Sequence, residues 1–281
     1  MKEREFNFYI INLPIRENKK ENIALYEDLI ISLFKKRKPV LIAKDKAAII
    51  RTLTSSTGTN KIIYGSMSTF TMIGKDWLNI EKLEKQSFEL PKNLFPNLRE
   101  SYYFFFPKYH RFLLMKATNG VSLGNVVKYF VNARDKKVSA YEYDVHYEVS
   151  KDAIKEIMTA DFVKTLKISV SYTNADIGST AFKFVDKELK ESNTQTLQVM
   201  AKSNKAEGID INKSKILKGS LDLSKSYGTA EASIIKNNKR RKVKTENYPF
   251  LLRLKSNLGD LQKFYNGLFH KLAEYLKDGE E

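Results

Sequence analysis

The sequence contains no cysteine, and this absence excludes disulfide bonds and thiolate metal sites. A chain without cysteine suits a reducing compartment, so we expect a cytoplasmic protein. No apolar run reaches about 18 residues, and we therefore expect no membrane-spanning helix. The opening MKEREFNFYIINLP lacks an apolar stretch that ends in a small-residue cleavage site, so we expect no signal peptide.

The motifs of the common enzyme classes are missing as well. The sequence contains no glycine-rich phosphate loop, no GxSxG nucleophile motif, no zinc-finger spacing and no helix-turn-helix signature. We therefore expect no catalytic residues, no bound metal and no cofactor.

The charge balance is the most informative global feature that is present. The 281 residues contain 49 Lys or Arg against 33 Asp or Glu, a net charge of +16, with 42% hydrophobic residues that suit a folded core. Codon usage in an AT-rich genome enriches lysine, but it also raises glutamate and does not explain this surplus. The charge predicts affinity for a polyanion, meaning DNA, RNA or an anionic membrane surface.

The hydrophobic patterns predict an α+β fold of mixed and antiparallel sheets with flanking helices. Strands are expected at 5–14, in VLIA and AAIIRTL, and at 61–73, 101–117, 164–173, 194–203, 228–236 and 247–256. Helices are expected at 22–34, 123–133, 151–158, 180–192 and 258–276, and the segment 76–100 is expected to be irregular with one or two helical turns. We expect two subdomains, 1–139 and 140–281, the second of which includes the basic hairpin and the terminal helix.

A basic hairpin is expected in the second subdomain. The segment 202–255 has 14 basic and 5 acidic residues, so it carries +9 in under a fifth of the chain. Within it, ASIIKNNKRRKVKTE predicts two strands joined by an Asn-Asn turn that tolerates positive φ. The basic side chains of this hairpin are Lys236, Lys239, Arg240, Arg241, Lys242 and Lys244. They predict a surface that contacts phosphates, the alternatives being a solvated turn or a nuclear-localisation signal.

A second basic cluster, Lys35, Lys36 and Arg37, follows the first predicted helix. It is a further candidate for the binding surface, although cations at a helix C-terminus are favourable without any ligand. Lysine, which dominates both clusters, acts as a point charge and reads bases less well than arginine. The aromatic residues lie in apolar runs that look buried, so they offer no stacking platform for single strands. Double-stranded DNA bound with little sequence preference is the favoured partner, with RNA as the alternative.

The segment YEYDVHYEV, residues 141–149, alternates strictly and predicts a strand. Its polar face would carry Glu142, Asp144, His146 and Glu148, which could contribute to a divalent metal site of a nuclease. The simpler interpretation is a strand with one face in water. His110 and His270 are expected to be structural.

The segment TLKISVSYTNADIGSTAFKFVDKELKESNTQTLQVMAKS, residues 165–203, has the order strand, turn, helix, strand. Together with YYFFFPKYHRFLLMKATNGVSLGNVVKYF upstream, it resembles the RexA-like phage-exclusion proteins and related bacterial anti-phage proteins. This resemblance implies a homodimer that binds DNA with little sequence preference in phage defence, and it transfers no catalytic residues.

Our leading hypothesis is therefore a DNA-binding accessory or sensor protein of prokaryotic defence, with a partner protein from the same operon as a further expectation. Two alternatives stay open: a metal-dependent nuclease that uses Glu142, Asp144 and Glu148, and an interaction subunit that pairs through the helix at 258–276.

Overall fold

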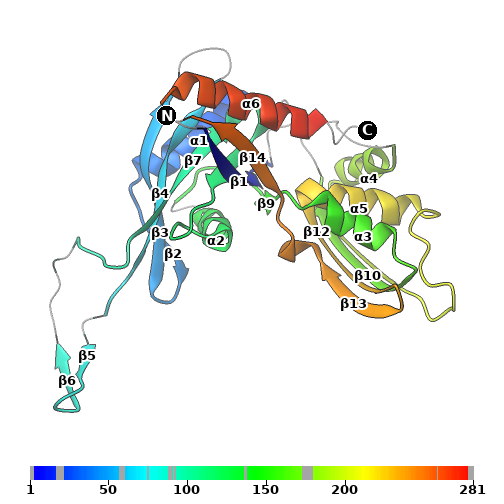
Figure 1. Ribbon diagram of the computed structural model, residues 1–281, viewed down its shortest axis with the longest axis horizontal. Helices are drawn as coiled ribbons and strands as arrows, with labels where there is room; N and C mark the ends of the chain where they lie inside the picture. The colour runs from blue at the N-terminus through cyan, green and yellow to red at the C-terminus, as the bar shows by residue number, and fades with distance from the viewer. Residues whose placement is uncertain are drawn as a thin grey trace.

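In the computed structural model, the described residues are 3–16, 22–56, 61–74, 76–87, 91, 93–135, 138–172, 180–257 and 259–277. They form six α-helices, two short 3-10 helices and three β-sheets. Figure 1 shows two lobes that meet at an angle, like the legs of an arch, and a thin hairpin that extends from the first lobe. The α+β class expected from the sequence is confirmed.

The first lobe is built on an eight-stranded antiparallel sheet, the large sheet, in the order β14-β1-β8-β7-β4-β3-β2 with β9 also paired to β1. Its strands are β1 (Arg4–Asn12), β2 (Val40–Ala43), β3 (Lys46–Ser55), β4 (Ile63–Thr71), β7 (Arg99–Phe106), β8 (Arg111–Met115), β9 (His146–Tyr147) and β14 (Leu251–Ser256). Helices α1 (Ile23–Lys35) and α2 (Leu123–Ala133) pack on one face, and α6 (Leu261–Lys277) packs on the other. The short helix η1 (Pro107–Tyr109) joins β7 to β8.

Both faces of the central strand β7 are buried, which explains its continuous aromatic sequence. Tyr103 and Phe105 belong to the core beneath α1 and α2, whereas Phe104 and Phe106 belong to the core beneath α6. Successive side chains of a strand point to opposite faces, so a strand covered on both sides must be apolar at every position. The expectation that this aromatic run lies at the centre of a sheet is confirmed.

The second lobe is built on a four-stranded antiparallel sheet, the small sheet, in the order β11-β10-β12-β13. Its strands are β10 (Phe162–Ser171), β11 (Thr196–Lys202), β12 (Gly228–Lys236) and β13 (Lys239–Lys244), and the short helix η2 (Thr245–Asn247) follows them. Helices α3 (Lys151–Met158), α4 (Thr180–Glu191) and α5 (Lys215–Tyr227) pack on one face through a shared apolar core. The opposite face of the small sheet has no helix on it (Figure 1).

Helix α5 was not expected from the sequence, because its apolar positions are interrupted by Gly219 and several serines. The glycine has a packing role. A Cβ atom at Gly219 would lie 2.1 Å from the carbonyl oxygen of Ala181 in α4, so the two helices approach more closely than any other residue would allow.

The segment 76–100 differs from the expectation of irregular chain with helical turns. It contains a short two-stranded sheet, β5 (Asp76–Asn79) paired with β6 (Glu84–Ser87), which we call the arm. The arm lies between β4 and β7 in the sequence, and it projects away from both lobes (Figure 1).

The C-terminal residues do not stay with the second lobe, although the sequence analysis assigned them to a subdomain 140–281. Strand β14 pairs with β1, and α6 buries Phe264, Leu268 and Leu272 against the large sheet. The chain therefore leaves the first lobe once and returns to it. The apolar face of α6 is covered by its own chain, which removes the geometric basis for pairing this helix with another subunit.

A buried ion pair joins the lobes. Arg111 Nε donates to Glu148 Oε1 at 2.8 Å, and their side chains are 5% and 0% exposed. Arg111 Nη1 also donates to Asn12 Oδ1 at 2.6 Å. The second oxygen of Glu148 accepts hydrogen bonds from Ser226 in α5 and from Tyr275 in α6, at 2.5 and 3.1 Å. One carboxylate thus connects the large sheet, the second lobe and the terminal helix.

Two histidines lie at the same junction and are held neutral. His110 stacks on Tyr26, and its Nε2 atom lies 3.4 Å from the hydroxyl of Tyr227. His146 Nε2 lies 3.0 Å from the hydroxyl of Ser171 in β10. Burial lowers the pKa of His110 well below its ordinary value and lowers the pKa of His146 to about 4. Both histidines are structural, as expected for His110.

We predict that acid weakens the folded state through these histidines. An unfolded histidine has a pKa near 6.5, so below that pH the unfolded chain binds protons that the folded chain does not, and the free energy of unfolding falls as pH drops from about 6.5 toward 4. Between pH 7 and 5 each histidine should contribute a loss of about 2 kcal/mol. Urea unfolding at both pH values measures it.

The variant His146→Gln keeps a side chain that can bond Ser171 and should lose about half of this pH dependence. His270→Gln, at an exposed position of α6, serves as the control. An unchanged pH dependence in His146→Gln would contradict the assignment of the effect to the junction.

Candidate nucleic-acid interface

The predicted basic hairpin is present as β12 and β13. Six residue pairs join the strands, from Glu231 with Lys244 to Lys236 with Lys239. Asn237 and Asn238 form the turn with φ of 50° and 60°. A two-residue hairpin turn with both residues at positive φ matches the right-handed twist of the strands, and asparagine tolerates this conformation.

Strand alternation divides the basic side chains of β13 between two faces. Val243 is buried in the core beneath the helices, so Lys239 and Arg241 point to that helix-covered side. Arg240 and Lys242 point to the opposite side, which we call the open face. The sequence placed all of these cations in one cluster, but the structure separates them.

Carboxylates neutralise the hairpin on the helix-covered side. Arg241 pairs with Glu156 of α3 at 3.3 Å, and the backbone N–H of Asn237 donates to Asp161 at 2.8 Å. Lys236 donates to the hydroxyl of Thr159 at 3.1 Å. On this side of the hairpin, Arg241 is thus neutralised by a carboxylate, and Lys236 and the turn are held by hydrogen bonds within the lobe.

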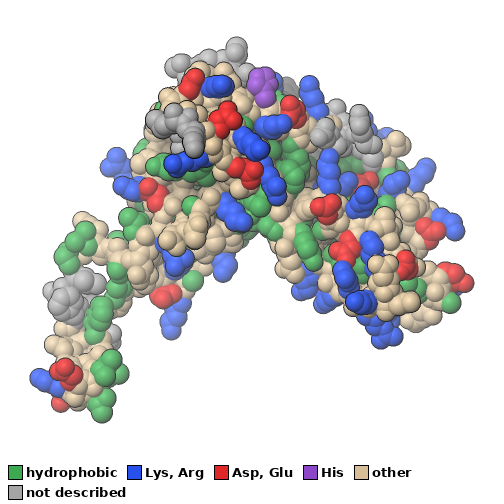
Figure 2. All heavy atoms as spheres, viewed as in Figure 1, with side chains coloured by type: hydrophobic (Ala, Val, Ile, Leu, Met, Phe, Trp, Pro, Cys, Tyr) green, Lys and Arg blue, Asp and Glu red, His purple; other side chains and the backbone are tan. Residues whose placement is uncertain are grey.

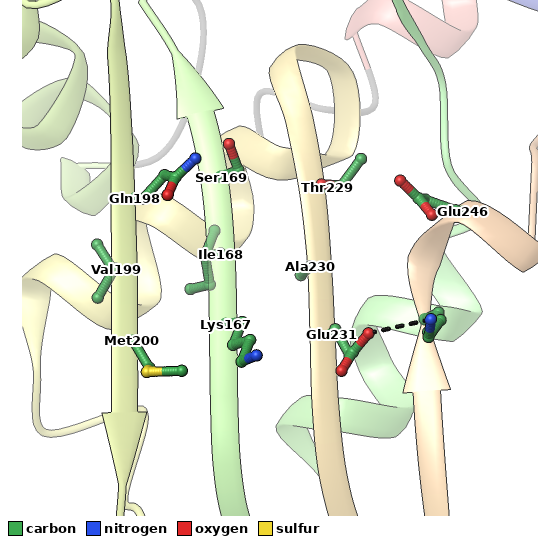
Figure 3. Close-up of a pocket in the computed structure, with 11 residues that line it drawn as sticks. Lys167, Ile168, Ser169, Gln198, Val199, Met200, Thr229, Ala230, Glu231 and Glu246 are labelled. Atoms are coloured by element: carbon green, nitrogen blue, oxygen red, sulfur yellow. Dashed lines mark ion pairs between the residues drawn. The ribbon is translucent and has the colours of Figure 1, made fainter.

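The open face gathers cations from three of its four strands, β10, β11 and β13. Cross-strand partners share a face, so the register places Lys167 beside Glu231 and Met200, and Lys202 on the row of Lys242. Figure 3 shows Met200, Lys167 and Glu231 side by side on β11, β10 and β12. The open-face cations are Lys164, Lys167, Lys202, Arg240, Lys242 and Lys244.

Two carboxylates lie among these six cations. Glu231 pairs with Lys242 at 2.8 Å and with Lys244 at 3.3 Å, and Glu246 lies at the edge of the same hollow (Figure 3). Hydrogen bonds from Lys242 and Lys244 hold the pKa of Glu231 below its ordinary value, so it stays ionised at neutral pH. The open face has a balance of +4.

The surface of the open face is hollowed in two places. One hollow of about 400 Å³ is lined by Ser169, Gln198 and Thr229, and its view fills Figure 3. A second, of about 640 Å³, lies between Lys164 and Arg240. Figure 2 shows Lys and Arg side chains gathered over the hairpin end of the second lobe.

The second basic cluster lies elsewhere. Lys35 ends α1, Lys36 caps it and Arg37 follows with φ of 46°, all of them exposed. Helix α1 packs on the large sheet, so this cluster belongs to the first lobe. The structure does not bring it onto the open face, and its place beyond the last helical turn agrees with a favourable helix C-terminus.

The acidic segment 141–149 does not form the expected strand. Only residues 146–147 are extended as β9, and the four polar side chains diverge. Asp144 pairs with Arg16 at 2.7 Å, Glu148 is bound to Arg111, and His146 contacts Ser171. The described residues contain no group of three or more His, Asp or Glu that could hold a metal ion. The four side chains therefore do not share the polar face that the nuclease alternative required.

The +9 segment is likewise distributed over several surfaces. Lys215, Lys218 and Lys225 lie on α5, and Lys225 pairs with Asp222 at 3.0 Å. Arg253 and Lys255 lie on β14 in the first lobe. The expectation of a single surface is therefore wrong for most of this segment, and its open-face share is Lys202 with three hairpin cations.

Comparison with known proteins places the whole chain in one family. A family described as a domain of unknown function, DUF4747, matches residues 4–273. The chain belongs to the DUF4747 family. The matched range runs from β1 into α6 and so includes both lobes and the arm of this DUF4747 protein. No curated protein matches the sequence.

Among the residues that the structure describes, no helix is both long and apolar enough to cross a membrane.

Sequence reasoning missed Lys164, Lys167 and Lys202 as members of the open face. Two of them had a readable signal, because Lys167 and Lys202 occupy polar positions of alternating strands. Lys164 lies at a β-bulge between Val163 and Thr165, which breaks the alternation. Only the pairing of the strands shows that these lysines lie beside the hairpin of this DUF4747 protein.

Removal of Glu231 should strengthen polyanion binding. Glu231→Gln frees Lys242 and Lys244 and adds one positive charge, so affinity for duplex DNA at 50 mM salt should rise by about 10-fold and the salt dependence should steepen by about one unit. Fluorescence anisotropy with a labelled duplex measures both.

The matched control is Glu274→Gln, which removes a carboxylate paired with Lys271 at 2.8 Å in the first lobe. An equal gain in both variants would show that net charge, and not the open face, sets the affinity.

Proposed function

We propose that this protein binds double-stranded DNA through the open face of the small sheet, contacting phosphates with little dependence on sequence. The observation that carries the proposal is the set of six cations on one sheet face with no helix covering it. Their positions on paired strands hold the charges in a fixed array, which reduces the cost of ordering them against a phosphate backbone.

The composition of the face favours phosphate contacts over base contacts. Five of the six cations are lysines, which bind phosphate as point charges, and Arg240 is the exception. Bidentate reading of guanine in the major groove needs arginine or a similarly planar donor. We therefore infer that counterion release drives the affinity for DNA, and that duplexes of different sequence bind with similar affinity.

Duplexes are favoured over single strands because the small sheet offers few rings. The sequences of β10, β11, β12 and β13 contain one aromatic residue, Phe162. Sheets that bind single strands stack successive bases on several exposed aromatic side chains. A single half-buried ring at one end of the sheet does not provide such a platform.

The biological role that we propose is an accessory or sensor function in prokaryotic phage defence, exercised in the cytoplasm. This part of the proposal rests on the resemblance to the phage-exclusion proteins. The charge array on the open face supports only the contact with nucleic acid.

A salt titration tests the contact. If about five phosphates are neutralised, the log–log dependence of the association constant on salt should have a slope of roughly −4.5, and affinity should fall by about 500-fold between 50 and 200 mM salt. Duplexes of unrelated sequence should give the same values within about threefold. Absence of binding at 50 mM salt would refute the proposal, and stronger binding to duplex RNA would redirect it.

A pair of double variants tests the face. Arg240→Gln with Lys242→Gln removes two charges from the open face, whereas Lys239→Gln with Arg241→Gln removes two from the helix-covered side of the same strand. The first pair should weaken binding by roughly 100-fold at 50 mM salt and flatten the slope by about two units.

The second pair should change affinity much less, because both of its side chains point to the helix-covered side and away from the open face. Circular dichroism establishes that both variants fold. Equal losses in the two variants would contradict an interface confined to the open face.

A further inference from the structure

The arm is a short hairpin that projects from the protein, and a hairpin of its size is not expected to be stable by itself. Its strands β5 and β6 have four residues each and pair Trp77 with Gln86 and Leu78 with Lys85. A two-stranded hairpin of this length is marginally stable in water without a surface to pack on. Figure 1 shows the arm extending away from both lobes, so its own chain does not supply that surface.

Apolar side chains cover every side of the arm. Trp77 and Leu78 are 41% and 64% exposed, and alternation points them to opposite faces. At the tip, Ile80 and Leu83 are 80% and 77% exposed. A hairpin that works in water carries polar side chains at its edges and tip, whereas large exposed apolar patches mark contact sites. Figure 2 shows hydrophobic side chains along this projection.

The charge of the arm argues against nucleic acid or an anionic membrane as its partner, although the net charge of the whole chain suits both. Residues 76–87 contain one Asp, two Glu and two Lys, a balance of −1 in a chain of +16. Nucleic acid and anionic membranes bind cationic surfaces, and a hairpin with this balance offers neither of them charge complementarity. The arm therefore fits a protein surface of apolar character.

We propose that the arm is the contact through which two copies of this chain associate, arm against arm. Of the 16 large apolar side chains that are exposed among the described residues, four lie on the arm, and three more, Leu94, Phe95 and Leu98, lie between the arm and β7. The other nine are scattered over both lobes, so the surface of a second copy that best matches an arm is its own arm. A two-fold contact of this kind uses the same patch on both copies.

Charge and strand edges favour the same arrangement. Two bodies of +16 repel one another at close range, and contact through the projecting arms, which carry none of the positive surplus, joins the copies while the lobes stay apart. Among the described residues, no third strand pairs with the outer edge of β5 or β6, and an antiparallel pair of arms would fill one edge of each. This inference is independent of DNA binding.

Trp77 is the only tryptophan in the sequence, so tryptophan emission reports on the arm directly. Mass by light scattering and emission maximum are measured on the protein free of nucleic acid, over a wide range of concentration, in about 0.5 M salt to screen the repulsion. We expect the mass to double as concentration rises and the emission to shift to shorter wavelength in the same range. A constant monomer mass would overturn the proposal.

The variant Leu78→Lys with Leu83→Lys should remain monomeric at concentrations where the native chain is dimeric, and the emission shift should disappear. The matched control is Ile216→Lys with Leu261→Lys, two apolar residues that are 49% and 52% exposed on α5 and α6. It adds the same charge and should stay dimeric. Far-ultraviolet circular dichroism establishes that both variants keep the fold of the lobes.

Persistence of the dimer in Leu78→Lys with Leu83→Lys would place the contact elsewhere and overturn the proposal. A native chain that stays monomeric at every concentration but binds duplex DNA would refute the arm contact and leave the open-face proposal intact. A chain that dimerises through the arm but does not bind DNA would refute the open-face proposal and leave the arm contact intact.

Discussion

The ion pair between Arg111 and Glu148 is the interaction on which the relation between the two lobes depends. Both charges are buried, and removal of either partner would leave the other unpaired, which costs about 3–5 kcal/mol in comparable sites. Glu148 also accepts hydrogen bonds from α5 and α6, so the same carboxylate positions the second lobe and anchors the terminal helix. Because Glu148 makes these contacts, it is not available to the metal site that the sequence of residues 141–149 suggested.

One-sided covering of the small sheet is the second constraint. Three helices bury the inward side chains of β10 to β13, and the other face carries mainly polar and charged residues, together with Met200 and Ile235. The alternation that buries Val243 places Arg240 and Lys242 on the open face and sends Arg241 to Glu156. Packing therefore selects which cations are free to meet a phosphate backbone. The arm differs from the small sheet, since its apolar residues Leu78, Ile80 and Leu83 are 64%, 80% and 77% exposed.

Local patterns predicted many of the elements correctly. The side chain of Asn22 caps α1, that of Ser122 caps α2, and the Asn-Asn turn joins β12 to β13. Each of these features depends on residues within a few positions of one another, so the sequence contains the information directly. Helix α5 was missed because Gly219 and its serines weaken the helical pattern. The strand expected at 141–149 forms only at His146–Tyr147. Three of its four alternating polar side chains are bound elsewhere, Asp144 by Arg16, His146 by Ser171 and Glu148 by Arg111.

The sequence by itself determined the α+β class, the hairpin with its basic strand, and a net charge that favours polyanions. It also determined which residues are too apolar to remain in water, including the aromatic run of β7. Only the tertiary structure decided which lobe the terminal helix covers, which cations share a face and which carboxylates are consumed in ion pairs. The reason is physical: periodicity and turn chemistry act over neighbouring residues, whereas strand order and charge pairing join positions that can lie more than a hundred residues apart.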